Sequence, residues 1–299
     1  MTTPATTPAA PITRPRWTAL AAVTVTVLAW ASAFVGIRAV GASYDAGPMA
    51  FGRLLVGCLA LGAGLLVSRR WVRPTRREWA LIVLCGLAWF AVYNVVLNAA
   101  EQRVDAGTTA MLVGVGPILI ALFAGLLLGE GFPRWLVIGA LIAFAGAMLV
   151  GAATSQGSGA DLLGVTFALV AAVTYAIGVL AQKAVLGRLP GLQVTWLACT
   201  IGVVGTLPFA PGLVTAVATA PAGATVGLLY LGAVPTALAF STWAYALARM
   251  DAGRLGLTTY LVPPIAVLMS AVLLGELPPP LAFVGGAICL VGVALSRRR

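Results

Sequence analysis

The chain has 299 residues, of which 61% are hydrophobic and only 9% are charged, and its formal net charge is +10. Because an average soluble protein has roughly 25% charged residues, this composition excludes an ordinary soluble domain and indicates a protein of the lipid bilayer. The sequence has no histidine, and its four cysteines all fall in apolar runs. We therefore expect no metal site, no cofactor and no disulfide framework.

Residues 1–16, rich in Thr, Pro and Ala, are predicted to form a disordered cytoplasmic tail and do not have the pattern of a signal peptide. Apolar segments of about 20 residues follow, the length that a helix needs to cross a membrane. A polar linker at 152–161 separates the segments into two halves, 17–151 and 162–296, and residues 297–299 form a basic end. The sequence thus predicts an all-α integral membrane protein with ten transmembrane helices, at 17–38, 47–67, 79–100, 106–128, 134–151, 162–182, 191–210, 223–247, 254–275 and 280–296.

Two short motifs occur twice at one spacing. Residues 103–107 (Arg-Val-Asp-Ala-Gly) return 146 residues later at 249–253, and Leu-Leu-Gly-Glu at 127–130 returns at 273–276. The halves are therefore two copies of one unit. Because each unit has five helices, an odd number, the second copy crosses the membrane in the opposite direction, and such inverted repeats are typical of carriers that rock about a central site.

The basic residues predict the orientation. If the amino terminus is cytoplasmic, fifteen of the 18 lysines and arginines lie in cytoplasmic loops or at the chain ends. This asymmetry predicts that both termini are cytoplasmic and that the chain is a multi-pass protein of the cell (inner) membrane. The positive charge is then a topology signal, so we expect no nucleic-acid partner. Since the duplication is internal, we expect a monomer.

These features resemble the EamA branch of the drug/metabolite transporter superfamily. The resemblance rests on Trp-Ala-Ser-Ala-Phe at 30–34, on Arg53, and on the paired Asp-Ala-Gly and Leu-Leu-Gly-Glu turns. It implies export of small solutes by alternating access, with neutral or aromatic amino acids, or related metabolites, as the expected class. An efflux carrier for drugs or other metabolites, such as nucleosides or cationic compounds, is the alternative.

The motifs and residue types that the sequence lacks narrow the range of possible functions. No catalytic set and no nucleotide-binding loop of the Gly-x-x-x-x-Gly-Lys type is present, which argues against an enzyme. All eight acidic residues fall in predicted loops or at helix ends. Because proton-driven efflux of cations would use a carboxylate inside the membrane, we rank it below export of neutral or zwitterionic solutes. Proton coupling and facilitated transport both remain open.

Helix breaks point to the position of the solute. Two corresponding segments, 106–128 and 254–275, are interrupted at matching depth, and a further proline lies in the middle of 223–247. A proline removes a backbone hydrogen bond and frees a carbonyl, which is tolerated only against protein or a wet cavity. We interpret the breaks as hinges around a central site, with packing kinks as the other interpretation; the hinge residues are Gly116, Pro117, Pro235, Pro263 and Pro264.

Polar and aromatic side chains inside the predicted helices are the candidate solute ligands. Such groups are costly in lipid unless they face the interior of a bundle, although ordinary helix packing would also explain them. Arg53 is the one charge well inside a helix: it either binds a solute carboxylate through a forked hydrogen-bond pair or extends to the outer headgroups. The candidate substrate-binding residues are Trp30, Ser32, Trp89, Tyr93, Asn94, Asn98, Tyr175, Gln182, Trp243, Tyr245 and Tyr260.

Overall fold

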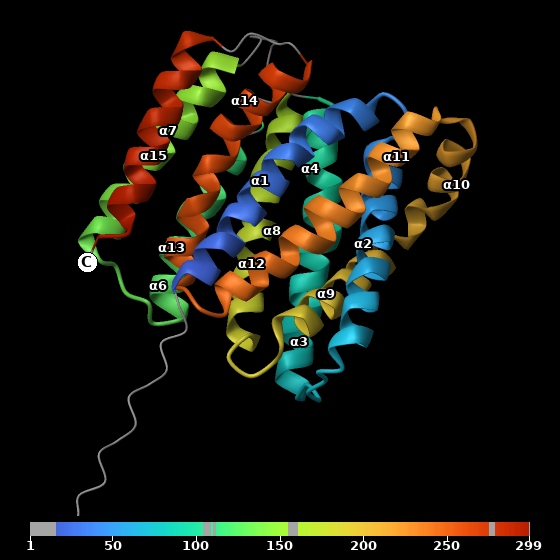
Figure 1. The fold of residues 1–299 in the computed structure, drawn as a ribbon, viewed down its shortest axis with the longest axis horizontal. Helices are drawn as coiled ribbons and strands as arrows, with labels where there is room; N and C mark the ends of the chain where they lie inside the picture. Colours follow the sequence, from blue (N-terminus) through green and yellow to red (C-terminus); the bar gives the residue numbers. More distant parts are fainter. Residues whose placement is uncertain (1–15, 104–108, 110–111, 155–160, 275–278, 299) are drawn as a thin grey trace, which may run out of the picture.

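The computed structural model describes residues 16–103, 109, 112–154, 161–274 and 279–298, and every regular element within these ranges is a helix (Figure 1). Residues 1–15 of the predicted tail, most of the linker, the first Asp-Ala-Gly turn and Glu276 lie outside the described residues, whereas Arg16 begins α1. The first half contains α1 (Arg16–Gly41), α2 (Ala46–Ser68), α3 (Arg76–Cys85), η1 (Gly86–Val92), α4 (Tyr93–Glu101), α6 (Val115–Leu127) and α7 (Arg134–Thr154). The second half contains α8 (Leu162–Val185), α9 (Gly191–Gly205), η2 (Leu207–Phe209), α10 (Ala210–Thr219), α11 (Ala222–Leu231), η3 (Gly232–Leu238), α12 (Ala239–Leu247), α13 (Ala252–Leu257), η4 (Thr258–Leu261), α14 (Val262–Leu274) and α15 (Pro280–Ser296).

Among the described residues, seven helices are long and apolar enough to cross a membrane, or eight if α9 and the helix after it form one span bent by 55°. The apolar helices α6 and α15 are shorter, with 13 and 17 residues. The ten-helix topology therefore stays a prediction, while the all-helical membrane fold is confirmed.

One predicted loop is a helix in the structure. We expected a single span at 191–210 followed by a loop, but α9 ends at Gly205 and α10 continues to Thr219. Pro208 and Pro211 explain the break, because a proline cannot extend a helix through its missing N–H but fits the first turn of the next one.

Matched π-helices mark the internal repeat in the structure. In η1 and η3 the backbone widens into a π-helix, and Gly86–Val92 corresponds to Gly232–Leu238 at the 146-residue spacing. Each π-helix begins where a glycine lets a helix of the other half approach, α9 at Gly86 and α2 at Gly232. Single π-turns within α-helices are frequent at functional sites.

Residues related by the repeat also contact each other. The Tyr260 hydroxyl donates to the Gly114 carbonyl at 2.7 Å, and 146 residues separate the two positions. Helices α7 and α15 pack antiparallel, since Gly139 faces Gly292 while Gly146 faces Gly285 (Figure 1). Equivalent helices that run in opposite directions and touch are what an inverted repeat would produce.

The bundle has two distinct ends (Figure 1). At the lower end α2 stops and α3 begins, on either side of the basic segment 69–77, and we call this the arginine end. The capping box of Thr75 and Glu78 starts α3 there. At the opposite end α1 and α4 stop, and we call this the Glu101 end.

Ion pairs near the ends of the candidate spans join the two halves at their edges. Arg188, in the turn after α8, binds Glu78, which raises the pKa of the guanidinium. Asp161, which caps α8, pairs with Arg103 at 3.1 Å, and this bond together with the Leu163 N–H lowers the pKa of the carboxyl. The second pair is exposed, so its contribution to stability is small.

Candidate functional site

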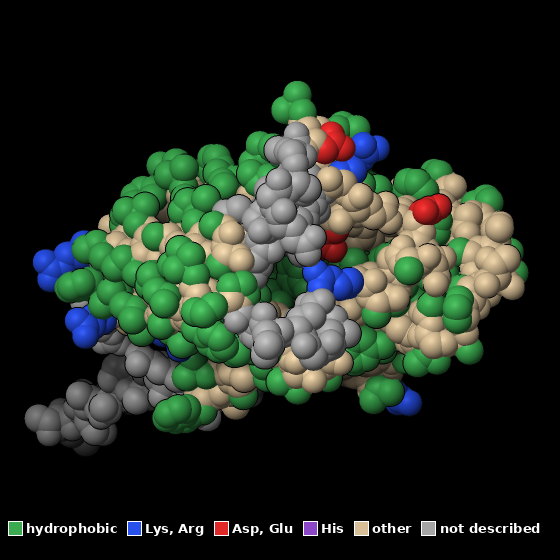
Figure 2. All heavy atoms as spheres, turned by 90° about the horizontal axis from the view of Figure 1, so that it is seen from above, with side chains coloured by type: hydrophobic (Ala, Val, Ile, Leu, Met, Phe, Trp, Pro, Cys, Tyr) green, Lys and Arg blue, Asp and Glu red, His purple; other side chains and the backbone are tan. Residues whose placement is uncertain are grey.

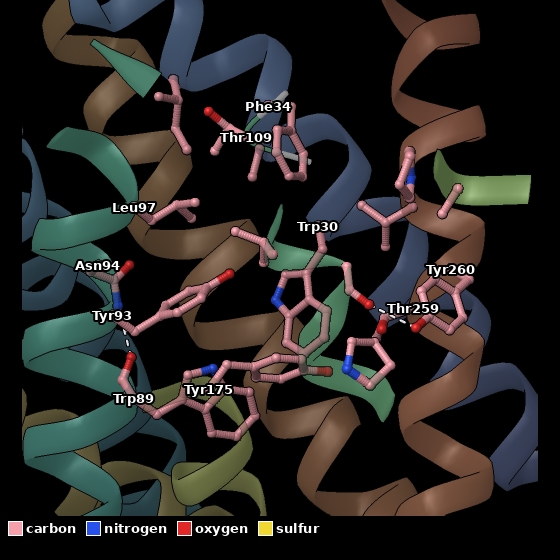
Figure 3. A pocket seen from close by; sticks show the side chains of 18 of the residues that line it. Trp30, Phe34, Trp89, Tyr93, Asn94, Leu97, Thr109, Tyr175, Thr259 and Tyr260 are labelled. Carbon is pink, nitrogen blue, oxygen red and sulfur yellow. Dashed lines mark hydrogen bonds between the residues drawn. The ribbon is translucent and has the colours of Figure 1, made fainter. Parts of the chain in front are cut away.

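A cavity of about 110 Å³ lies between the two halves (Figure 3). Figure 2 views the Glu101 end and shows a hollow there, with hydrophobic side chains inside and charged ones beside it. The walls come from α1, α2, the α3–η1–α4 run, α6, α7, α8, α12 and the η4–α14 junction. The lining residues are Trp30, Ala33, Phe34, Ile37, Arg53, Trp89, Tyr93, Asn94, Leu97, Thr109, Val113, Gly114, Pro117, Ala147, Tyr175, Phe240, Thr259, Tyr260, Val262 and Pro263.

Aromatic rings from both halves form one wall of the cavity (Figure 3). The Trp89 ring centroid lies 6.2 Å from that of Trp30 and 5.4 Å from that of Tyr175, and Tyr93 lies 6.0 Å from Tyr175. A Cβ at Gly116 would collide with the Tyr175 ring, so this glycine allows the contact. The first pair is edge-on and the other two are tilted, and such aromatic contacts are favourable and present apolar surface to a ligand.

Several polar side chains in the cavity wall form hydrogen bonds to backbone carbonyls at irregular parts of the helices. The Asn94 amide donates to the carbonyls of Trp89 and Phe90, at 3.2 and 2.8 Å, which the widened turns of η1 expose. The Tyr175 hydroxyl is buried beside Thr259 without a hydrogen bond of normal geometry to a described residue. An unpaired buried hydroxyl is available to a ligand.

Arg53 brings a positive charge to the cavity from α2. Its side chain is only 5% exposed, and its Nε donates to the Thr236 hydroxyl at 3.3 Å. The Thr236 hydroxyl in turn donates to the Leu231 carbonyl at 2.9 Å, within the π-helix that contains Pro235. The π-helix of one half thus positions the arginine of the other. In this structure the buried Arg53 lines the cavity.

Glu101 lies near Arg53 at the end of α4. Tyr93, Leu97 and Glu101 are spaced by four residues and share one helix face, and the first two line the cavity. The Glu101 carboxylate interacts with the charges of Arg53 and Arg38. Its Oε1 atom is buried and has no hydrogen-bond partner among the described residues. Glu101 was not predicted as a site residue because its position at a helix end gave no sign of burial.

The profile of the EamA-like transporter family matches residues 17–152 and again residues 162–298. The chain belongs to this family. It is therefore a multi-pass transporter of the cell membrane with a small-molecule substrate, and not an enzyme.

Several proteins are similar to this EamA-like transporter. A "probable terminal-alkyne amino-acid exporter" of Streptantibioticus cattleyicolor is 39% identical, with 93% of each chain covered. The "uncharacterized transporter YdfC" of Bacillus subtilis is 30% identical over 89% of this chain and 87% of its own. A "probable amino-acid metabolite efflux pump" of Salmonella typhimurium is 23% identical over 69% of this chain and 72% of its own. One crystal structure superposes with a TM-score of 0.77 at 21% identity, covering 95% of this chain and 97% of that one, which supports the fold.

Nine of the residues predicted for the site of the EamA-like transporter line the cavity. The structure brings together Arg53 with two of the hinge residues and six of the candidate ligands. These nine residues are Trp30, Arg53, Trp89, Tyr93, Asn94, Pro117, Tyr175, Tyr260 and Pro263.

The other five candidate ligands do not line the cavity in this conformation. Ser32 bonds to Tyr230, Asn98 to the Ala46 carbonyl, and Gln182 to Thr195. Trp243 is buried behind Trp30, and the Tyr245 hydroxyl bonds to Thr18. Their contact with the solute stays a prediction.

The predicted hinge residues lie at helix junctions. Pro117 and Pro263 fall in the first turns of α6 and α14, directly after the irregular positions Gly114 and η4. Pro264 packs on Gly286 of α15, and Pro235 lies in η3. Whether the backbone bends there during transport stays a prediction.

The repeat holds a signal that would have found two of the missed lining residues, Phe240 and Gly114, as the counterparts of the predicted residues Asn94 and Tyr260. Four pairs of cavity residues are related by the 146-residue spacing, so the cavity lies where the halves meet symmetrically. Phe240 and Thr259 were missed because their own residue types carry little signal, yet each corresponds to another lining residue. The pairs are Asn94 with Phe240, Val113 with Thr259, Gly114 with Tyr260, and Pro117 with Pro263.

Proposed function

We propose that this transporter exports zwitterionic amino acids with apolar or aromatic side chains through the cavity. The observation that carries the proposal is the buried Arg53 guanidinium in an otherwise largely apolar, aromatic wall. Arginine binds carboxylates through two parallel hydrogen bonds, and the bond to Thr236 uses only its Nε. The carboxylate of the solute would bind the free end of the fork, and its side chain would lie against Trp30, Trp89 and Tyr175.

Glu101 would complete the recognition of a zwitterion. The Glu101 carboxylate interacts with Arg53. The amino group of a solute whose own carboxylate binds Arg53 would therefore be attracted electrostatically to Glu101. The repeat supports this role, because Arg53 corresponds to Ala198, at the spacing of 145 residues that relates the first helices of the two halves, and Glu101 corresponds to Leu247 at the spacing of 146. Residues that build the symmetric fold occur twice, whereas this charged pair occurs once. The pair therefore fits an asymmetric solute better than it fits a structural role.

Two relatives support this class of solute through their names, an exporter of terminal-alkyne amino acids and an efflux pump for amino-acid metabolites. A carrier for lipophilic cations is less compatible with the wall, since a buried arginine repels a positive charge. Neither coupling to protons nor facilitated movement is favoured by the groups in the cavity.

We further propose that the ten segments cross the membrane as two inverted repeats with both termini in the cytoplasm. The basic segment 69–77 would then be cytoplasmic, and the hollow at the Glu101 end would open to the outside. Transport would alternate this state with one open at the arginine end, with the junctions at Pro117 and Pro263 as hinges. Cysteines introduced for Arg70 and Arg103 test the orientation: an impermeant thiol reagent added to cells should label position 103 and not position 70, and the reverse pattern would overturn it.

Transport by purified protein in liposomes tests the function. We expect counterflow of radiolabelled phenylalanine or leucine that is competed by the unlabelled amino acid and not by 3-phenylpropionate, which lacks the amino group. Phenylalaninamide, which lacks the carboxylate, should also fail to compete. Silence for every neutral amino acid, with flux of a lipophilic cation such as tetraphenylphosphonium, would replace the proposal with drug efflux.

A further inference from the structure

The two repeated motifs meet across the halves at the arginine end, away from the cavity. Glu130, which closes the Leu-Leu-Gly-Glu motif of the first half, accepts two backbone hydrogen bonds from the second half. The donors are the N–H groups of Ala252 at 2.7 Å and Gly253 at 3.0 Å, both in the second Asp-Ala-Gly motif. The Leu-Leu-Gly-Glu motif of the first half thus binds the Asp-Ala-Gly motif of the second half.

A lysine of another helix also binds the chain just before this motif. The Lys183 ammonium, near the end of α8, donates to the carbonyls of Leu247 at 2.8 Å and Met250 at 2.6 Å. Its charge also interacts with Glu130. Residues 247–253, which join α12 to α13, are therefore held from two sides by opposite charges. We call the contacts of Glu130 and Lys183 with this segment the clamp.

The clamp lies at the end of the molecule opposite the hollow. Figure 1 shows α6, α8 and α12 ending at the lower side, whereas the hollow of Figure 2 opens at the upper side. No residue of the clamp lines the cavity. Between the clamp and the cavity lies packed protein, including Trp243 and Ala244, which are 1% and 0% exposed.

The chemistry of the clamp suits a contact that forms and breaks. Hydrogen bonds to a charged group are about twice as strong as neutral ones, so four of them hold the end firmly. They are nevertheless few and local, and the groups that they join can be solvated by water when apart. A continuous apolar interface would not separate at so small a cost.

We propose that Glu130 and Lys183 are gating residues, whose clamp keeps the arginine end closed while the cavity is open at the Glu101 end. The inference rests on the proposed function only in assuming that the arginine end opens during transport. Release of the clamp would free α13 from α6 and α8, which it packs against in this structure. In the repeat Lys183 corresponds to Arg38, at the 145-residue spacing of the first helices, and Glu130 corresponds to Glu276. Glu276 lies outside the described residues, so the proposal is confined to the end described.

The reactivity of single cysteines tests the clamp without any solute. Two probes are introduced into a chain whose native cysteines are replaced by alanine. Ala33→Cys reports on the open cavity, which Ala33 lines, and Ala244→Cys reports on the closed end, one helical turn from Phe240. The rate of N-ethylmaleimide reaction is measured for both probes with Glu130→Gln, Lys183→Met and the conservative control Lys183→Arg.

The populations of two conformations depend on the difference in free energy between them. Loss of a contact that is present in only one conformation therefore shifts the population toward the other. We expect Glu130→Gln and Lys183→Met to raise the rate at Ala244→Cys at least fivefold and to lower it at Ala33→Cys, with Lys183→Arg close to the parent. Equal rates in all variants would overturn the proposal and leave Glu130 as an ordinary helix cap. A rise at both probes would also overturn it, since general loosening exposes both positions. Absence of amino-acid transport would not affect either outcome.

Discussion

Replacement of Arg53 by methionine separates a binding role from a structural one. Methionine keeps much of the length and apolar volume of the arginine stem but removes the guanidinium. The described hydrogen bond of Arg53 is a long one of 3.3 Å to Thr236, while the residue is only 5% exposed. Such a bond contributes about 1 kcal/mol, and burial of the guanidinium itself costs free energy. The charge partner Glu101 is only half-buried, at the open end of the cavity, where water can solvate its carboxylate when the arginine is absent. We expect the free energy of unfolding to change by no more than about 1 kcal/mol.

Solute affinity should respond very differently. Loss of one partner from a buried, hydrogen-bonded charge pair costs about 2–5 kcal/mol, which corresponds to at least a roughly 30-fold weaker Kd. Thr236→Val removes only the acceptor that orients Arg53, and we expect a smaller loss of about 1 kcal/mol, or roughly fivefold. The expected order of affinity is therefore wild type, then Thr236→Val, then Arg53→Met.

Binding of labelled phenylalanine to purified protein, together with thermal unfolding, measures both quantities. Phenylalaninamide, added as a competitor, serves as the matched ligand: it lacks the carboxylate, so it should bind wild type weakly, and Arg53→Met should not weaken its binding further. If Arg53→Met instead lowers the unfolding free energy by 3 kcal/mol or more, or weakens both ligands alike, the guanidinium is structural and our reasoning about the cavity is refuted.

Two further predictions concern stability. Gly292→Ala would place a methyl group against the backbone of Ala143, where α7 and α15 pack together, and we expect the free energy of unfolding to fall by about 1–3 kcal/mol. The control Gly223→Ala has open space at its position and should cost no stability. Similar thermal midpoints for both variants would contradict the close packing. Because Arg103 lowers the pKa of the Asp161 carboxyl below its unfolded value, the ion pair stabilises the fold at neutral pH, and this small contribution is lost as the pH falls below about 4. The unfolding midpoint of Asp161→Asn should therefore lie below that of wild type at pH 7 and converge with it in acid, and a difference that persists at low pH would rule out the pair as its source.

Much of the architecture can be predicted from local sequence patterns. The apolar segments predict membrane helices because an unpaired backbone group in lipid is costly, and the spacing of two motifs predicts a duplication. The same spacing recurs in the paired π-helices and in the contact of Tyr260 with Gly114. Patterns of this kind are local or periodic, so they survive without knowledge of which helices pack together.

The solute cavity was predictable only in part. Aromatic residues deep in the helices carried the signal for Trp30, Trp89, Tyr93 and Tyr175, which do line it. Residue type alone did not separate them from Trp243, which has the same character but is buried behind Trp30. The rotation of each helix about its axis decides between the two positions, and the bundle as a whole sets that rotation.

The sequence by itself determined the membrane class, the two halves and the family of this transporter, because composition, segment length and repeated motifs depend on neighbours along the chain. Only the tertiary structure decided the partners of the charged residues. Arg53 and Thr236 are 183 residues apart, and Glu130 and Ala252 are 122 apart. Residues so distant meet only when both halves have folded against each other, and the side chain of a buried charge takes its role from the groups that surround it there.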